Sequence, residues 1–443
     1  MVLTKSMLKH FSKEANTPEN KILRNAITQN GINSVALNRD VVNSLHYTFS
    51  KEIKTGKITN QENSGRCWLF AGLNLFRQRV SSKYNIKNFE LSQSYLMFWD
   101  KLEKSNYFLE NIIKTRKEDK QSRLLMWLLR DPVQDGGQWD MFVSLVQKYG
   151  VVPKYVMPET YHSKKSYHMN NVLTLKLRAD AAVLRRMHER GKSEKALKKK
   201  KEEMLGEIYQ MLVRFFGIPR DSFDFEYTDK KKKFHFDRDL TPKKFFKKYV
   251  GLELNDFVSL VNAPTKDKPF DRTYTVKYLG NVMEGRKILY LNVDSKTFKK
   301  ATLGQLKEDL PVWFGCDVVK MMDSDSGLMD KNLFMYDDAL GVETKLDKGE
   351  RLDYGESQLT HAMLFTGVNL VKGKPNRWKV ENSWGKDKGD KGYFVMSDDW
   401  FDEYNYQVIV KEKYLPAKAK KALKKKPIEL PPWDPLGSLA PMR

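Results

Sequence analysis

Several features that define common protein classes are scarce or missing in this sequence. Only two of its 443 residues are cysteine, Cys67 and Cys316, which excludes a framework of disulfide bonds. No apolar run approaches the roughly 18 residues that a membrane-spanning helix needs, and residues 1–10 lack the apolar segment of a signal peptide. A thiol that takes part in a reaction must stay reduced, and this favours a reducing compartment. We therefore expect a cytoplasmic protein that does not contact a membrane.

Patterns that would hold a metal or a nucleotide are also missing. The seven histidines do not cluster, and His162 and His168 have no flanking cysteines or paired carboxylates. The sequence contains neither a glycine-rich phosphate loop nor a repeat. We therefore expect no metal and no cofactor.

Positive charge, in contrast, is abundant. The net charge is +23, from 79 lysines and arginines against 56 aspartates and glutamates, and fifteen of the positive charges lie in lysine runs at 195–201, 230–233 and 418–426. Each run alone is best interpreted as a solvated face, but together they would attract polyanions in a salt-dependent way. The runs lack interleaved aromatic residues, so any binding of nucleic acid should be non-specific.

Four separated residues supply the groups that a cysteine nucleophile needs to hydrolyse an amide. Cys67 provides a thiol, His361 an imidazole, Asn382 an amide that can orient the imidazole, and Gln61 a second amide for an oxyanion. Each residue alone would more often be structural. Their occurrence together, in this order, favours a nucleophilic site.

The local sequence supports this interpretation of Cys67. The segment 67–79 has apolar residues near helical spacing and follows the Ser64-Gly65 turn, which predicts a helix that starts at the thiol. The dipole of such a helix favours the thiolate, and Gln61 can direct its side-chain NH2 toward an oxyanion beside the backbone N–H of Cys67. Cys316, in the apolar run 312–316, is expected to be an ordinary core residue.

The other two residues fall on predicted strands. His361 opens the apolar run 361–365, and Asn382 ends the alternating segment 378–381. A histidine at the start of one strand and an asparagine at the end of the next can meet across a hairpin. Trp384 would then shield their hydrogen bond from water.

These strings closely resemble bleomycin hydrolase and bacterial aminopeptidase C, a branch of the papain-like cysteine peptidases. The resemblance is nearly end to end and is carried by Ser64-Gly65-Arg66-Cys67-Trp68, Thr360-His361-Ala362-Met363, Glu381-Asn382-Ser383-Trp384-Gly385, Trp433-Asp434-Pro435 and the segment 135–141. It implies an α+β, papain-like fold of two lobes. It also implies a ring-shaped homohexamer with a basic channel, which binds nucleic acid in some members.

The resemblance further implies how a substrate is bound. Gly136 and Gly137 either form only a tight turn or, as in papain relatives, let a substrate backbone approach because they lack Cβ atoms. In the family a C-terminal arm lies in the cleft, and its terminal carboxylate holds the α-ammonium of the substrate. Family members commonly end near Ala440, whereas this chain continues to Arg443. We therefore expect trimming back toward Leu439 or Ala440, or displacement of the tail.

Composition divides the chain into segments. We expect an N-terminal arm at 1–50 with strand-like residues at 45–49, a helical lobe with the nucleophile at 51–160, a charged helical insertion for assembly at 161–250, a β-rich lobe with His361 and Asn382 at 251–415, and an extended C-terminal arm at 416–443. Strands are expected at 273–276, 288–293, 311–314 and 392–396.

The favoured function is that of a cysteine aminopeptidase, with bleomycin-hydrolase-type amide hydrolysis as an added activity. Two alternatives remain open at the level of sequence. One is an endopeptidase on the same scaffold, and the other is a nucleic-acid-binding protein whose peptidase activity is secondary.

Overall fold

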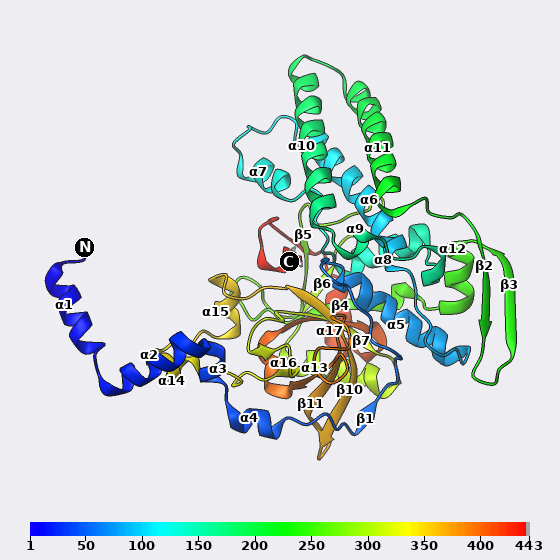
Figure 1. Cartoon of the computed structure of the whole chain (residues 1–443). Coiled ribbons are helices and arrows are strands. Elements are labelled where there is room, and N and C mark those ends of the chain that lie inside the picture. The colour runs from blue at the N-terminus through cyan, green and yellow to red at the C-terminus, as the bar shows by residue number, and fades with distance from the viewer. Residues whose placement is uncertain (440–443) are drawn as a thin grey trace.

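The chain begins with helices that stand away from the rest of the molecule. In the computed structural model, which describes residues 1–439, α1 (Lys5–Glu14) and α2 (Pro18–Asn30) project to one side of the body (Figure 1). Each starts at a threonine, Thr4 or Thr17, whose hydroxyl accepts a backbone N–H of the first turn. Every residue of these two helices keeps part of its surface exposed.

The arm then returns to the body through α3 (Ile32–Ala36) and α4 (Arg39–Ser44) and ends at the short strand β1 (Lys51–Glu52). The expected strand at 45–49 is wrong, because these residues are irregular. Phe49 is buried and Arg377 donates to the backbone oxygen of Thr48. The alternating pattern therefore reflects packing of a loop against a sheet.

A buried helix forms the centre of the helical lobe. The apolar residues of α5 (Cys67–Lys83) lie on all sides, which is typical of a helix surrounded by protein. The close approach of α8 to α5 requires Gly72, since a Cβ there would lie 2.6 Å from the ring of Phe142. The other helices of this lobe are α6 (Gln93–Lys114), α7 (Arg123–Arg130) and α8 (Trp139–Tyr149).

The charged segment after residue 160 forms a projecting pair of long helices (Figure 1). The expected helical character is found in α10 (Tyr167–Glu189) and α11 (Glu194–Phe216), which pack on α6 with buried residues at helical spacing, while their lysines are exposed or only partly buried. The segment also contains α9 (Tyr161–Lys164), the hairpin of β2 (Phe223–Thr228) and β3 (Phe234–Leu240), and α12 (Pro242–Phe245).

The second lobe is built on a large, mainly antiparallel sheet. Its strand order is β14-β5-β6-β4-β13-β7-β10-β11-β12-β9-β8, with β1 added to β10. The expected strands are present. Their bounds are β4 (Phe257–Val261), β5 (Arg272–Val276), β6 (Tyr290–Asn292), β7 (Val312–Cys316), β8 (Met322–Asp323), β9 (Leu328–Met329), β10 (His361–Val371), β11 (Lys374–Glu381), β12 (Tyr393–Ser397), β13 (Asn405–Lys411) and β14 (Ile428–Leu430).

Helices cover this sheet and extend into the C-terminal arm. Of the helices in this part of the chain, α13 (Ser295–Lys307) and α16 (Asp398–Tyr404) pack on the sheet, α14 (Tyr336–Leu340) packs on α3, and α15 (Lys348–Asp353) precedes β10 in the chain. The expectation that the whole arm is extended is wrong, because α17 (Ala417–Leu423) occupies its lysine-rich part. The buried methyl groups of Ala419 and Ala422 pack this helix on β5 and β6.

The predicted α+β class is confirmed.

A buried ion pair joins the two lobes behind the site. Nη2 of Arg77, on α5, lies 2.8 Å from Oε1 of Glu381 at the end of β11, and both side chains are almost completely buried. Glu381 directly precedes Asn382, so the pair fixes the strand end that carries the asparagine. Removing one charge would leave the other buried without its counter-ion.

We predict that Arg77→Met lowers the free energy of unfolding by about 3–5 kcal/mol, which is typical when one partner of a buried pair is removed. Urea denaturation measures this change. Lys51→Met is the matched control, because it breaks the exposed Lys51–Asp309 pair and should cost at most about 1 kcal/mol. Equal losses in the two variants would contradict the prediction.

Candidate active site

Cys67 lies where the two lobes meet. It is the first residue of α5 and is almost completely buried, and α5 packs against β7 and β10. The predicted start of the helix at the thiol is confirmed. The unsatisfied backbone N–H groups of the first turn therefore lie beside Sγ, and their partial positive charge favours a thiolate.

Arg66, next to the thiol, supports the turn before it. Its buried guanidinium forms an ion pair with Glu159, with Nη1 2.8 Å from Oε2. Its Nε donates to the hydroxyl of Ser64 at 2.8 Å, and Nη2 donates to the carbonyl of Gln61 at 3.4 Å. Because Glu159 balances its charge, Arg66 acts mainly as a brace for residues 61–66.

Gln61 is held from both lobes. Its backbone N–H donates to the carbonyl of Ser383 at 2.8 Å, and the Ser383 hydroxyl donates to the side-chain Oε1 of Gln61 at 2.7 Å. The side-chain Nε2 donates to the carbonyl of Ser64 at 2.6 Å. A primary amide has two N–H donors, so this orientation leaves one for an oxyanion.

His361 and Asn382 are brought together by a hairpin, as the sequence predicts. β10 and β11 pair antiparallel, and Nε2 of His361 lies 2.9 Å from Oδ1 of Asn382. Because an amide oxygen only accepts, the neutral ring carries its proton on Nε2, and Nδ1 is then the nitrogen that can exchange a proton with a thiol. The ring of Trp384 packs on the imidazole with centroids 4.9 Å apart.

Cys316 is more closely connected to this site than its apolar surroundings in the sequence indicated. It is fully buried, as expected, but it lies directly opposite His361 in the pairing of β7 with β10. Burial raises the pKa of its thiol well above the usual range, and the nearby Asp317 and Cys67 raise it further. Cys316 is therefore a protonated thiol beside the strand that carries His361.

Asp135 ties the turn before Cys67 to the loop that carries the two glycines. Its Oδ2 accepts the backbone N–H of Gly65 at 2.9 Å, and its backbone oxygen accepts the indole N–H of Trp68 at 2.8 Å. Lys101 contributes an ion pair at 2.6 Å, and Ser166 and Asn170 donate further bonds. Burial alone would raise the pKa of Asp135, but Lys101 and these hydrogen bonds outweigh it and hold the pKa well below its usual range.

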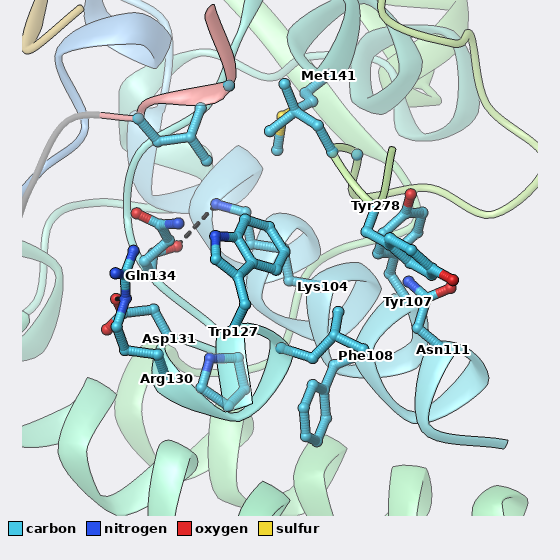
Figure 2. A pocket seen from close by; sticks show the side chains of 16 residues that line it. Lys104, Tyr107, Phe108, Asn111, Trp127, Arg130, Asp131, Gln134, Met141 and Tyr278 are labelled. Carbon is cyan, nitrogen blue, oxygen red and sulfur yellow. Dashed lines mark hydrogen bonds and ion pairs between the residues drawn. The ribbon is translucent and has the colours of Figure 1, made fainter. Parts of the chain in front are cut away.

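Gly136 and Gly137 follow Asp135 at the edge of the cleft. A Cβ on Gly137 would lie 2.5 Å from the ring of Trp68, so this glycine is required for packing against the residue after Cys67. The carbonyl of Gly136 accepts a bond from the buried Lys104 at 2.6 Å. Figure 2 shows Lys104 also reaching toward Gln134, whose carbonyl it contacts at 2.7 Å. The loop at 134–137 is therefore held by Trp68 on one side and by Lys104 on the other.

The described part of the C-terminal arm reaches both lobes through Ser438. The backbone oxygen of Ser438 accepts a bond from Nε2 of Gln138 at 3.1 Å, and its hydroxyl donates to the carbonyl of Leu359 at 3.0 Å. Gln138 precedes α8, and Leu359 lies two positions before His361. The predicted substrate-binding residues Ala440 and Arg443 lie outside the described residues.

Residues 1–439 lack both a metal-binding cluster and a membrane-spanning helix. No group of three or more histidines, cysteines, aspartates or glutamates in this range could hold a metal ion. No helix in the same range is long and apolar enough to cross a membrane.

Sequence reasoning missed the residues that hold this site in shape. Asp135, Glu159 and Ser383 act through contacts with residues far away in the chain. The one available signal was the unusual number of polar residues around Cys67, which require buried partners. It indicates that partners exist but does not identify them.

Comparisons with known proteins agree with this geometry. The model of the family described as "Peptidase C1-like family" matches residues 2–437. Aminopeptidase C of Listeria innocua is 50% identical over 439 residues and covers 99% of each chain, and aminopeptidase C of Lactobacillus delbrueckii subsp. lactis is 46% identical, covering 96% of this chain and 95% of that one.

A solved structure gives the same result for the whole fold. The crystal structure of PepW from Lactobacillus rhamnosis HN001 is 50% identical, has a TM-score of 0.98 and covers 99% of each chain. The match of sequence and structure over nearly the full length shows that the chain belongs to the peptidase C1-like family.

Proposed function

We propose that this protein is a cysteine aminopeptidase that removes N-terminal residues from peptides. The observation that carries the proposal is the His361–Asn382 hydrogen bond at the lobe seam, close to a thiol at a helix N-terminus. The relatives named aminopeptidase C support the same activity.

The reaction follows from the groups that meet where the two lobes join. The thiol of Cys67 passes its proton to Nδ1 of His361, and Sγ attacks the carbonyl carbon of the substrate. The resulting oxyanion is stabilised by the side-chain N–H of Gln61 and the backbone N–H of Cys67. His361 gives its proton to the departing amine, which leaves a thioester. Water then attacks the thioester while His361 accepts a proton, and the thiol is restored. Asn382 keeps the imidazole oriented through both steps.

Substrate binding uses the loop and the arm on either side of the thiol. We propose that the backbone of Gly136 and Gly137 borders the bound substrate. The arm blocks the side of the cleft that an endopeptidase would leave open, and a terminal carboxylate at or beyond Ala440, up to Arg443, pairs with the α-ammonium. Such a charge needs a partner, because burying it alone costs several kcal/mol.

The endopeptidase and nucleic-acid alternatives are less well supported. The bonds of Ser438 to both lobes favour an arm that restricts the cleft. The buried, hydrogen-bonded set around Cys67 favours an enzyme over a protein that only binds nucleic acid. The same chemistry would also hydrolyse amides of the bleomycin type.

The proposal includes a cytoplasmic location, since a thiol nucleophile must stay reduced to react. It also includes a homohexamer whose active sites face an internal space, with the arm at 1–50 and the insertion at 161–250 used for assembly. Non-specific binding of nucleic acid to the lysine-rich surface would accompany this arrangement.

We predict that Cys67→Ala lowers activity by several orders of magnitude and that iodoacetamide labels Cys67 before Cys316 at pH 6. Cys316 should react slowly because burial raises the pKa of its thiol, which keeps it protonated. Peptide mapping of the alkylated protein measures the order. Asn382→Ala should cost less than Cys67→Ala, because the amide exchanges no proton. Preferential labelling of Cys316 would refute the assignment.

We predict that removing residues 437–443 increases cleavage of N-acetylated peptides relative to the same peptides with a free amine. The matched control removes only residues 441–443 and should keep the preference for free amines, because it leaves the bonds of Ser438 in place. Mass spectrometry of the products and of the intact protein reports both cleavage and any trimming of the tail. Efficient cleavage of blocked peptides by the intact chain would establish the endopeptidase instead.

We predict a mass near six times the 51.9 kDa of one chain by light scattering at micromolar protein and moderate salt. Affinity for DNA should fall steeply as salt rises, because binding would release counter-ions. A single-chain mass would contradict the hexamer, and salt-insensitive DNA binding would contradict the electrostatic part.

A further inference from the structure

The C-terminal arm is fastened to the body before it enters the cleft. After β14 pairs with β5, Trp433 lies under the guanidinium of Arg123, whose central carbon is 3.9 Å from the ring centroid. The next residue, Asp434, places Oδ2 3.1 Å from Nζ of Lys268. We call these two contacts, Arg123–Trp433 and Lys268–Asp434, the latch.

The ion pair of the latch is almost completely shielded from solvent. The side chains of Lys268 and Asp434 are only 5% and 7% exposed. Burial alone would lower the pKa of Lys268, but Asp267 and Asp434 outweigh it and raise the pKa above its usual value. Lys268 is therefore charged, and its charge is stabilised by these carboxylates. Loss of Lys268 would leave the buried carboxylate of Asp434 without its counter-ion.

Asp434 also shapes the turn that follows it. Its Oδ1 accepts the backbone N–H of Leu436 at 2.9 Å, and its backbone oxygen accepts the N–H of Gly437 at 2.8 Å. Leu436 is buried, and Gly437 fits tightly, since a Cβ there would lie 2.9 Å from Cγ1 of Val276. The latch and the turn therefore form one rigid unit.

Beyond this unit the described part of the arm consists of Ser438 and Leu439, and Leu439 packs against the core. Ser438 makes one hydrogen bond to each lobe, and Gly437 and Leu439 form part of the wall of a cavity of about 80 Å³ that is also lined by Trp127 and Tyr278 (Figure 2). A slip of one residue would move Ser438 by about 3.3 Å and break both bonds. Two hydrogen bonds offset little of the entropy lost by ordering several residues.

We propose that Lys268 and Arg123 are specificity-determining residues, which act by latching Asp434 and Trp433 so that the arm stays in register within the cleft. This inference rests on the proposed aminopeptidase function. The latch decides how strongly a free N-terminus is preferred over a blocked one, and it leaves the chemistry at Cys67 unchanged.

The test compares Lys268→Met with a matched control, in which the lysine of a different ion pair to the same arm is replaced. Lys277→Met removes the lysine that lies 3.5 Å from Glu429, where both side chains are more than half exposed. The measured quantity is the ratio of kcat/KM for an N-acetylated peptide to kcat/KM for the same peptide with a free amine. Lys268→Met should raise this ratio at least about tenfold, and Lys277→Met should leave it unchanged, because a buried pair matters far more than an exposed one.

A second variant guards against simple misfolding. Lys268→Met with Asp434→Asn leaves no carboxylate at position 434 to lie unpaired and keeps an acceptor for the N–H of Leu436, so it should fold and still raise the ratio several-fold. Arg123→Gln should raise it in the same direction. Arg186→Gln is its control, because Arg186 is an exposed arginine lining the same surface hollow as Trp433.

Hydrogen exchange gives a readout that does not depend on activity. The amides of Leu436 and Gly437 should exchange faster in the latch variants, whereas the rate of Cys67 alkylation should not change. An unchanged peptide ratio, or unchanged exchange, would overturn the latch. Failure of the unaltered protein to cleave peptides with free amines would instead contradict the proposed function, and the exchange rates would still report on the latch.

Discussion

The site depends on a short backbone pairing between the turn before Cys67 and the turn after Asn382. Gln61 donates to the carbonyl of Ser383 at 2.8 Å, and Gly385 donates to the carbonyl of Thr59 at 3.2 Å. The thiol and the imidazole come from different lobes, so this pairing sets their separation through the backbone. A displacement of about 1 Å can cost a hundredfold in rate. The backbone pairing between the two lobes therefore has to be rigid before any substrate binds.

A cluster of buried charges fixes the loop at Asp135 and Gly136, which contacts the turn before Cys67. Burial is the main reason that the pKa of Asp100 is raised and that of Lys104 is lowered, so each group is costly to keep ionised. An apolar core could be as stable, because desolvation of ions costs several kcal/mol each. What the charges add is geometry. Lys104 holds the carbonyl of Gly136, and Asp135 holds the turn at Gly65.

The sequence predicts the parts of the site whose signal is local. The helix start at Cys67 follows from the pattern of residues 67–79, and the hairpin joins His361 to Asn382, which are only 21 positions apart in the chain. Long-range partners could not be predicted in this way, because Gly65 and Asp135 are joined only by the fold. Cys316 looked unrelated to the site for the same reason. The helix at 417–423 was missed because lysines dominate its composition, although its two buried alanines hold it to the sheet.

The structure also changes how the lysine runs are understood. On α11, Lys198 lies 2.9 Å from Glu194 and Lys200 lies 2.9 Å from Glu203, and Lys201 pairs with Glu110 of α6. The first two pairs are exposed and each contributes little to stability, whereas the third is partly buried. They do, however, reduce the field that the run at 195–201 would otherwise produce. The long-range attraction of a protein with a net charge of +23 must therefore come more from the other basic segments than from the helical pair, even though this pair projects from the body (Figure 1).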